Sequence, residues 1–148
     1  MVDKIYKAFV DATYNVFNLM LNISDISNHP IEEFTCDKEV DIIVGVVGEL
    51  QGEVIYRFPV ITSLNMVNIM SGMEFDDVDI FVTSAISEIA NIISGNVITA
   101  LSDNELRYDI LPPVQGEPNN DKEYEIIESC CISTPIGEVC LDIRLNRA

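Results

Sequence analysis

The sequence predicts an α/β fold of the α+β kind, in which a mainly antiparallel sheet of hairpins packs against long helices. Two long segments have the helical period, and two pairs of valine- and isoleucine-rich segments are each separated by a short turn. The length of 148 residues and the apolar fraction of 48% fit one globular domain with its own core. We therefore expect a single domain over residues 1–148.

The first two fifths of the chain predict a helix, a loop and a hairpin. Apolar residues recur at three- and four-residue steps over residues 3–23, which is typical of one buried helix face. The polar stretch that follows, up to Pro30, predicts a loop. Strands are expected over residues 40–50 and 53–58, with Gln51-Gly52 as the turn of a hairpin.

Two further helices are expected in the middle of the chain. A short helix over residues 60–73 begins after a proline, and Gly72 is placed to end it. The longest helix is predicted over residues 78–101 and follows an acidic break. Either Asp77 or Asp79 is expected to cap its first turn.

The last third predicts an irregular connection and a second hairpin. Residues 102–121 contain three prolines and indicate at most one short strand. Strands over residues 124–133 and 139–145 are joined by a turn at 134–137. Each half of the chain thus holds a long helix followed by a hairpin. This weak pseudo-repeat is either a coincidence or the trace of a duplication.

The charge of the chain limits its partners. It carries 25 acidic and 8 basic residues, for a net charge of −17, so nucleic acid and anionic lipid are poor partners. The acidic surface serves solubility or favours a partner with a basic rim. We see no continuous apolar run long enough to span a membrane and no export signal at the start, so a cytoplasmic location is expected.

The cysteines do not indicate a metal site. Cys36, Cys130, Cys131 and Cys140 form no C-x-x-C pair, and His29 is distant from the last three in sequence. Cys131 and Cys140 are placed to face each other across the second hairpin. In a reducing compartment we expect buried, reduced thiols.

One face of the longest predicted helix combines small and polar residues. Helical spacing aligns them along a strip beside a broad apolar side. Such a strip is ordinary on the outer face of a helix, although mid-helix asparagine is less favourable than alanine by roughly half a kcal/mol. Only Glu88 and Asn91 project far from this strip. Its members are Ser84, Ser87, Glu88, Asn91, Ser94 and Gly95.

The spacing of Ser84, Glu88 and Asn91 resembles the signature of the CheC/CheX/FliY phosphatases. In that family a proline follows a little over twenty residues later, and here Pro112 or Pro113 stands near that place, with Pro113 one position early. A single complete motif is more similar to CheX than to CheC. The first helix offers only Asp11, Asn15 and Asn18, with asparagine in place of the glutamate, so a first site is expected to be vestigial.

The resemblance implies a phosphatase acting on the aspartyl phosphate of a CheY-like response regulator. It implies that Asn91 orients the attacking water, that Glu88 docks on the regulator's active-site lysine, and that Ser84, Ser87 and Gly95 contact the partner. No cofactor is expected in this chain, because the regulator would bring Mg²⁺. A homodimer formed through the sheets is also implied. No other catalytic motif is present in the sequence. The alternative to the phosphatase is a non-catalytic adaptor of the same fold.

Overall fold

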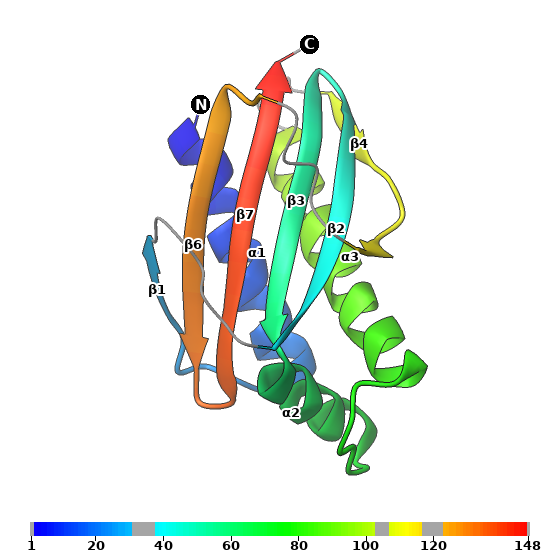
Figure 1. Cartoon of the computed structure of the whole chain (residues 1–148). Coiled ribbons are helices and arrows are strands. Elements are labelled where there is room, and N and C mark those ends of the chain that lie inside the picture. Colours follow the sequence, from blue (N-terminus) through cyan, green and yellow to red (C-terminus); the bar gives the residue numbers. More distant parts are fainter. Residues whose placement is uncertain (1, 31–37, 103–106, 117–122, 148) are drawn as a thin grey trace.

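The computed structural model describes residues 2–30, 38–102, 107–116 and 123–147. It contains one antiparallel sheet with two long helices packed on one of its faces and a shorter helix at one end of the strands, while the other face carries no helix (Figure 1). The helices are α1 (Val2–Leu21), α2 (Val60–Ser71) and α3 (Ile80–Ser102). The strands are β1 (Ser27–Pro30), β2 (Glu39–Gly48), β3 (Leu50–Pro59), β4 (Tyr108–Ile110), β5 (Val114–Gln115), β6 (Ile126–Thr134) and β7 (Gly137–Arg147).

The sheet is built from the two predicted hairpins. Its strand order is β1-β6-β7-β3-β2-β4, with β5 pairing to β2, and every pair is antiparallel. The hairpins β2–β3 and β6–β7 meet through their second strands, β3 and β7, at the middle of the sheet. Each hairpin follows a long helix in the sequence, so the predicted α+β class and the helix–hairpin arrangement of both halves are confirmed.

Alternation along the strands separates a helix-facing side from an open side. Tyr56 on β3 contacts α3, and its partners in register are Ile42 on β2 and Leu141 on β7, so all three face the helices. The neighbouring residues Ile55 and Arg57 therefore face the open side. Both long helices contribute the opposite half of the core, with Phe9 and Phe17 of α1 and Ile86 and Ile93 of α3 buried among its members.

Three local predictions differ from the structure. The first hairpin turns at Glu49, between Gly48 and Leu50, and not at Gln51-Gly52. Gly48 has φ of 111°, a conformation that suits glycine. Gly52 lies inside β3, where a side chain would collide with the carbonyl oxygen of Arg144 on β7. Part of the predicted loop before Pro30 is strand β1, because it pairs with β6. The connection after α3 holds two short strands, not one.

Cys131 and Cys140 are joined by a disulfide, which corrects the expectation of reduced thiols. They are direct partners in the β6–β7 register, with Cα atoms 4.1 Å apart, so their side chains meet on the same face. Because Leu141 faces the helices, Cys140 faces the open side of the sheet. Cys130 is buried and free, whereas Cys36 lies outside the described residues.

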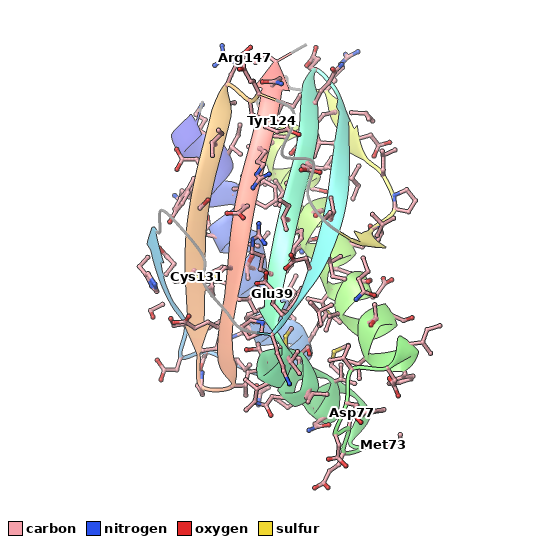
Figure 2. The ribbon with its side chains drawn as sticks, in the orientation of Figure 1. Glu39, Met73, Asp77, Tyr124, Cys131 and Arg147 are labelled. Carbon is pink, nitrogen blue, oxygen red and sulfur yellow. A yellow bond between two sulfur atoms is a disulfide. The ribbon has the colours of Figure 1, made fainter. Side chains whose placement is uncertain are left out.

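An arginine on the open side is surrounded by carboxylates. Arg57 donates from Nε to Asp142 at 2.6 Å and from Nη1 to Asp41 at 3.1 Å and to Glu39 at 3.4 Å (Glu39 is labelled in Figure 2). One buried oxygen of Glu39 and one of Asp41 have no hydrogen-bond partner. Burial and the neighbouring carboxylates together outweigh Arg57, so the pKa values of Glu39 and Asp41 are raised.

Among the residues that the structure describes, one helix is long and apolar enough to cross a membrane by length and composition alone, which the sequence pattern did not predict. That segment is Ile80–Leu101 of α3. In this structure its apolar side packs on the sheet, with Val82, Ile89 and Val97 almost fully buried. The apolar composition of α3 is therefore used in the core of the domain.

Candidate functional site

The candidate site lies on α3, which runs beside α1 across the helix-covered face of the sheet (Figure 1). Its first turn is capped by Asp79, whose Oδ1 accepts a hydrogen bond of 2.9 Å from the Val82 amide. This confirms one of the two predicted caps. The preceding helix α2 ends at Gly72, which has left-handed dihedrals and donates its amide to Asn68, as expected.

A buried hydrogen bond fixes the rotation of α3 on the sheet. The Tyr56 hydroxyl and the Ser94 hydroxyl are 2.6 Å apart, and both residues are fully enclosed. Burial raises the pKa of Tyr56 well above its usual value. Ser94 was placed on the polar strip by the sequence analysis, but it is only 2% exposed and belongs to the core. Ser94 lies at the edge of the buried side of α3, and the burial of Val82, Ile89 and Ile93 leaves the other side of the helix to solvent.

The outward side of α3 carries the predicted site residues. Ser84 and Glu88 are exposed, and Ser87, Asn91 and Gly95 are half-buried. Steps of three and four residues stack Ser84, Glu88, Asn91 and Gly95 along one line, with Cβ atoms of neighbouring members about 5–6 Å apart. In the described part of the chain, no side-chain hydrogen bond or ion pair occupies Glu88 or Asn91. Both side chains are therefore available to a partner.

Gly95 has no internal reason to be glycine. A Cβ built at this position meets no atom within 4 Å, and the residue lies inside a regular helix. Glycine within a helix is less favourable than alanine by roughly 0.5–1 kcal/mol. Glycine at position 95 therefore lowers the stability of the helix, and packing within the domain does not explain why a larger residue is absent there.

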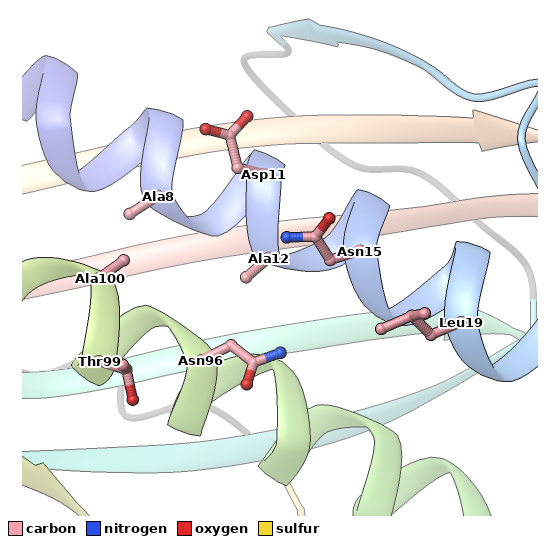
Figure 3. A pocket seen from close by; sticks show the side chains of 8 residues that line it. All are labelled: Ala8, Asp11, Ala12, Asn15, Leu19, Asn96, Thr99 and Ala100. Atoms are coloured by element: carbon pink, nitrogen blue, oxygen red, sulfur yellow. The ribbon is translucent and has the colours of Figure 1, made fainter.

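The first helix carries the corresponding incomplete motif. Asp11, Asn15 and Asn18 are all exposed on α1. Asp11 and Asn15 line a groove of about 630 Å³ between α1 and α3, opposite Asn96 and Thr99 (Figure 3). Glu88 and Asn91 do not line this groove. The complete and the incomplete motifs therefore lie on separate surfaces of the helix pair.

The downstream prolines lie between β4 and β5, at residues 112 and 113. Both short strands contact α3, so the segment that carries the prolines follows the side of this helix. The prolines therefore lie in a segment whose flanking strands contact the helix that carries the motif.

The donor groups of the described chain fit a metal ion poorly. One group of three possible ligands comes together, formed by Cys131, Glu138 and Cys140. Both sulfur atoms of this group are already joined in the disulfide. It also lies on the sheet, whereas Glu88 and Asn91 project from α3.

Two exposed apolar residues at the start of α3 were missed by the sequence analysis. Ile80 is 85% exposed and Phe81 is 51% exposed. The signal was available in the sequence, because Ile80, Ser84 and Glu88 follow each other at steps of four residues. These two side chains extend the outward side of α3 toward the helix N-terminus.

Comparisons with known proteins find similar sequences over most of the chain. The family model described as "Chemotaxis phosphatase CheX" matches residues 40–131, which is more than half of the chain and includes Glu88 and Asn91. The CheY-P phosphatase CheX of Thermotoga maritima is 27% identical over 148 residues, covering 97% of this chain and 95% of that protein.

Solved structures share the fold over nearly the whole chain. The CheX of a CheX–CheY–BeF3–Mg²⁺ complex from Borrelia burgdorferi is similar with a TM-score of 0.81 and 26% identity, covering 96% of this chain and 97% of that one. The chemotaxis protein CheX of Vibrio vulnificus has a TM-score of 0.81 at 19% identity, covering 96% and 99%. FliY of Thermotoga maritima has a TM-score of 0.65 at 15% identity, covering 92% and 84%.

Proposed function

Because the chain belongs to the CheX family of chemotaxis phosphatases, we propose that it hydrolyses the aspartyl phosphate of a CheY-like response regulator. The observation that carries this proposal is the position of Glu88 and Asn91 on the outward side of α3. Neither side chain has a hydrogen-bond or ion-pair partner within the described ranges, and both stand on a helix whose rotation is held by the contact between Tyr56 and Ser94. The site is thus preorganised for a surface that approaches from outside.

Asn91 is the proposed catalytic residue. Its side-chain amide donates and accepts hydrogen bonds, so it can hold a water molecule in line with the phosphorus atom. It has no proton to exchange near neutral pH, and its contribution is positioning. Phosphoryl transfer depends mainly on positioning and charge neutralisation, so this contribution suits the reaction.

Glu88 is the proposed docking residue. It precedes Asn91 by one helical turn on the same line of side chains, so both reach one cleft of a partner. A carboxylate there pairs with a lysine ammonium by a charge-assisted hydrogen bond. In this proposal the lysine belongs to the regulator, and the pair sets the register in which Asn91 enters. Ser84, Ser87 and Gly95 are the small neighbours that permit close approach.

The divalent cation of the reaction is assigned to the regulator in this proposal. The Borrelia burgdorferi complex contains CheX, CheY, BeF3 and Mg²⁺ together. The group of Cys131, Glu138 and Cys140 does not fit such an ion, because its sulfur atoms form a disulfide. When bound to the regulator, Mg²⁺ would neutralise charge on the phosphoryl oxygens. The contribution of this chain is then limited to Glu88, Asn91 and their neighbours.

The decay of a phosphorylated regulator tests the proposal. Purified regulator is phosphorylated, and loss of its phosphate is followed with and without this protein. The Asn91→Ala variant should lower kcat by about 100-fold or more, because the water loses its positioning group. Asn96→Ala is the matched control, since Asn96 is an exposed asparagine of the same helix outside the line of Glu88 and Asn91. A variant Asn91→Ala with full activity would refute this role.

The same assay separates the phosphatase from an adaptor. Tight binding to the activated regulator without any change in its rate of dephosphorylation would identify a binding module. The intact pair of Glu88 and Asn91 supports the phosphatase.

Assembly and location follow from the family in this proposal. The open face of the sheet offers a surface for a homodimer, and light scattering at micromolar concentration tests it against a monomer. A cytoplasmic location places the protein with the receiver domain it acts on.

A further inference from the structure

The outward side of α3 does not end at Ser84. Ile80 lies one turn before Ser84, and Phe81 lies seven residues before Glu88, or about 10 Å along the helix axis. Ile80 is 85% exposed and Phe81 is 51% exposed. Both side chains therefore continue the surface of Glu88 and Asn91 toward the N-terminus of the helix, and we refer to them together as the apolar anchor.

The apolar anchor is held in place by the segment before it. The ring of Phe81 stacks on Phe75, with ring centroids 5.2 Å apart and an interplanar angle of 9°. The Phe75 amide donates to the side chain of Asn68 on α2 at 2.9 Å. Asp79 caps the first turn of α3 directly before the anchor. The exposure of Ile80 and Phe81 is thus a property of an ordered segment tied to two helices.

Four acidic residues precede the anchor in the sequence, and we refer to them as the acidic rim: Glu74, Asp76, Asp77 and Asp79. All four are exposed, and Asp77 is labelled beside the start of α3 in Figure 2. No lysine, arginine or histidine occurs between Arg57 and Arg107. In the described part of the chain no ion pair neutralises the rim. A partner covering the anchor therefore meets uncompensated negative charge.

We propose that the apolar anchor and the acidic rim form a docking surface for the receiver domain of the regulator, beside its phosphorylation pocket. The contact requires an apolar spot on the receiver, bordered by lysine or arginine. This inference rests on the proposed function and deepens it, because the surface is continuous with the line of Glu88 and Asn91. In this proposal the anchor and the rim select the regulator, whereas Asn91 takes part in the chemistry.

The charge of the chain disfavours the two other occupants of such a surface. A second copy bound symmetrically through this surface would bring its own acidic rim against this one. An anionic lipid surface is repelled for the same reason. A receiver domain with a basic border removes both penalties and is attracted over a distance of about one Debye length.

The test compares KM and kcat in the dephosphorylation assay, together with binding to a regulator activated by BeF3 and Mg²⁺. Replacing both anchor residues (Ile80→Ser with Phe81→Ser) should raise KM and the binding Kd at least about tenfold and leave kcat within about twofold. Ile80→Ser alone should show part of this effect without disturbing the Phe75–Phe81 stack. The matched control is Ile61→Ser, which removes a 68% exposed isoleucine at the start of α2.

The acidic rim is tested by charge and salt. Asp76→Asn with Asp77→Asn should lower kcat/KM several-fold at low salt, and the difference should disappear at high salt. Asn91→Ala should behave in the opposite way to the anchor variant, because it should lose kcat and retain binding to the regulator.

The outcomes distinguish this inference from the function beneath it. A wild-type protein without effect on regulator dephosphorylation would refute the proposed function. An active wild type whose Ile80→Ser, Phe81→Ser variant keeps its KM would refute the docking surface alone. Two other results would overturn the proposal by assigning the anchor to another occupant. One is a wild-type dimer in light scattering that the Ile80→Ser, Phe81→Ser variant no longer forms. The other is binding of the wild type to phosphatidylserine vesicles that this variant has lost.

Discussion

Replacing Gly95 by alanine should stabilise the protein and at the same time weaken its activity. A Cβ at this position meets nothing within 4 Å, so the folded chain accepts the methyl group without strain. The substitution removes a mid-helix glycine and should add about 0.5–1 kcal/mol to the free energy of unfolding. For a domain of this size that gain corresponds to an increase in Tm of about 1–4 °C.

The predicted loss of activity has a different cause. Gly95 lies one turn after Asn91 on the side of α3 that we assign to the regulator, so any side chain there separates the two surfaces. Gly95→Ala should lower kcat/KM toward the phosphorylated regulator, and the bulkier Gly95→Leu should lower it further. Thermal unfolding and regulator dephosphorylation are measured on the same samples. Asn96→Ala serves as the control, with a comparable gain in helix propensity and unchanged activity.

Two results would refute this reasoning in separate places. A lower Tm for Gly95→Ala would show that the open space is needed by the folded chain itself. An unchanged kcat/KM for both variants would show that the partner does not approach Gly95.

Two further predictions concern the open side of the sheet. Burial, followed by repulsion from Asp41, raises the pKa of Glu39, so the folded state holds this proton more tightly than the unfolded state. The resulting contribution to stability is present below the unfolded pKa and is lost as pH rises through the folded pKa. Urea unfolding should therefore show Glu39→Gln gaining stability over wild type between about pH 4 and pH 8, and an equal difference at both ends would contradict this. Replacing Cys131 and Cys140 together by serine should lower the free energy of unfolding by about 2–3 kcal/mol under oxidising conditions, given their sequence separation of 9. Reductant should remove the difference between wild type and this variant, and phosphatase activity should not change, because the disulfide faces away from α3.

Local sequence patterns determined most of the elements. The helical period defined α1 and α3, because side chains three and four residues apart must share a face. Gly72 ended α2 and Asp79 capped α3 through interactions within a few residues. The same local geometry placed Ser84, Glu88 and Asn91 on one line. The candidate site was therefore predictable, since it lies on a single helix.

These local patterns could not predict the register between strands that are distant in the sequence. The turn at Glu49 depends on Gly52 lying close to the backbone of β7, more than ninety residues later in the chain. The strand β1 exists because it pairs with β6, and four residues such as Ser27–Pro30 carry no strand signal of their own. The disulfide likewise depends on Cys131 and Cys140 being opposite each other in the β6–β7 register.

The outward side of α3 shows both contributions together. The sequence by itself determined that Ser84, Glu88, Asn91 and Gly95 share one side of a helix, because that follows from the helical repeat. Only the tertiary structure decided that this side faces solvent. The apolar residues Val82, Ile89 and Ile93 are buried on the opposite side, and the hydrogen bond between Tyr56 and Ser94, across 38 positions of sequence, holds the edge beside Asn91 in the core. A helix has two long faces, and contacts with distant residues decide which of them is left for a partner.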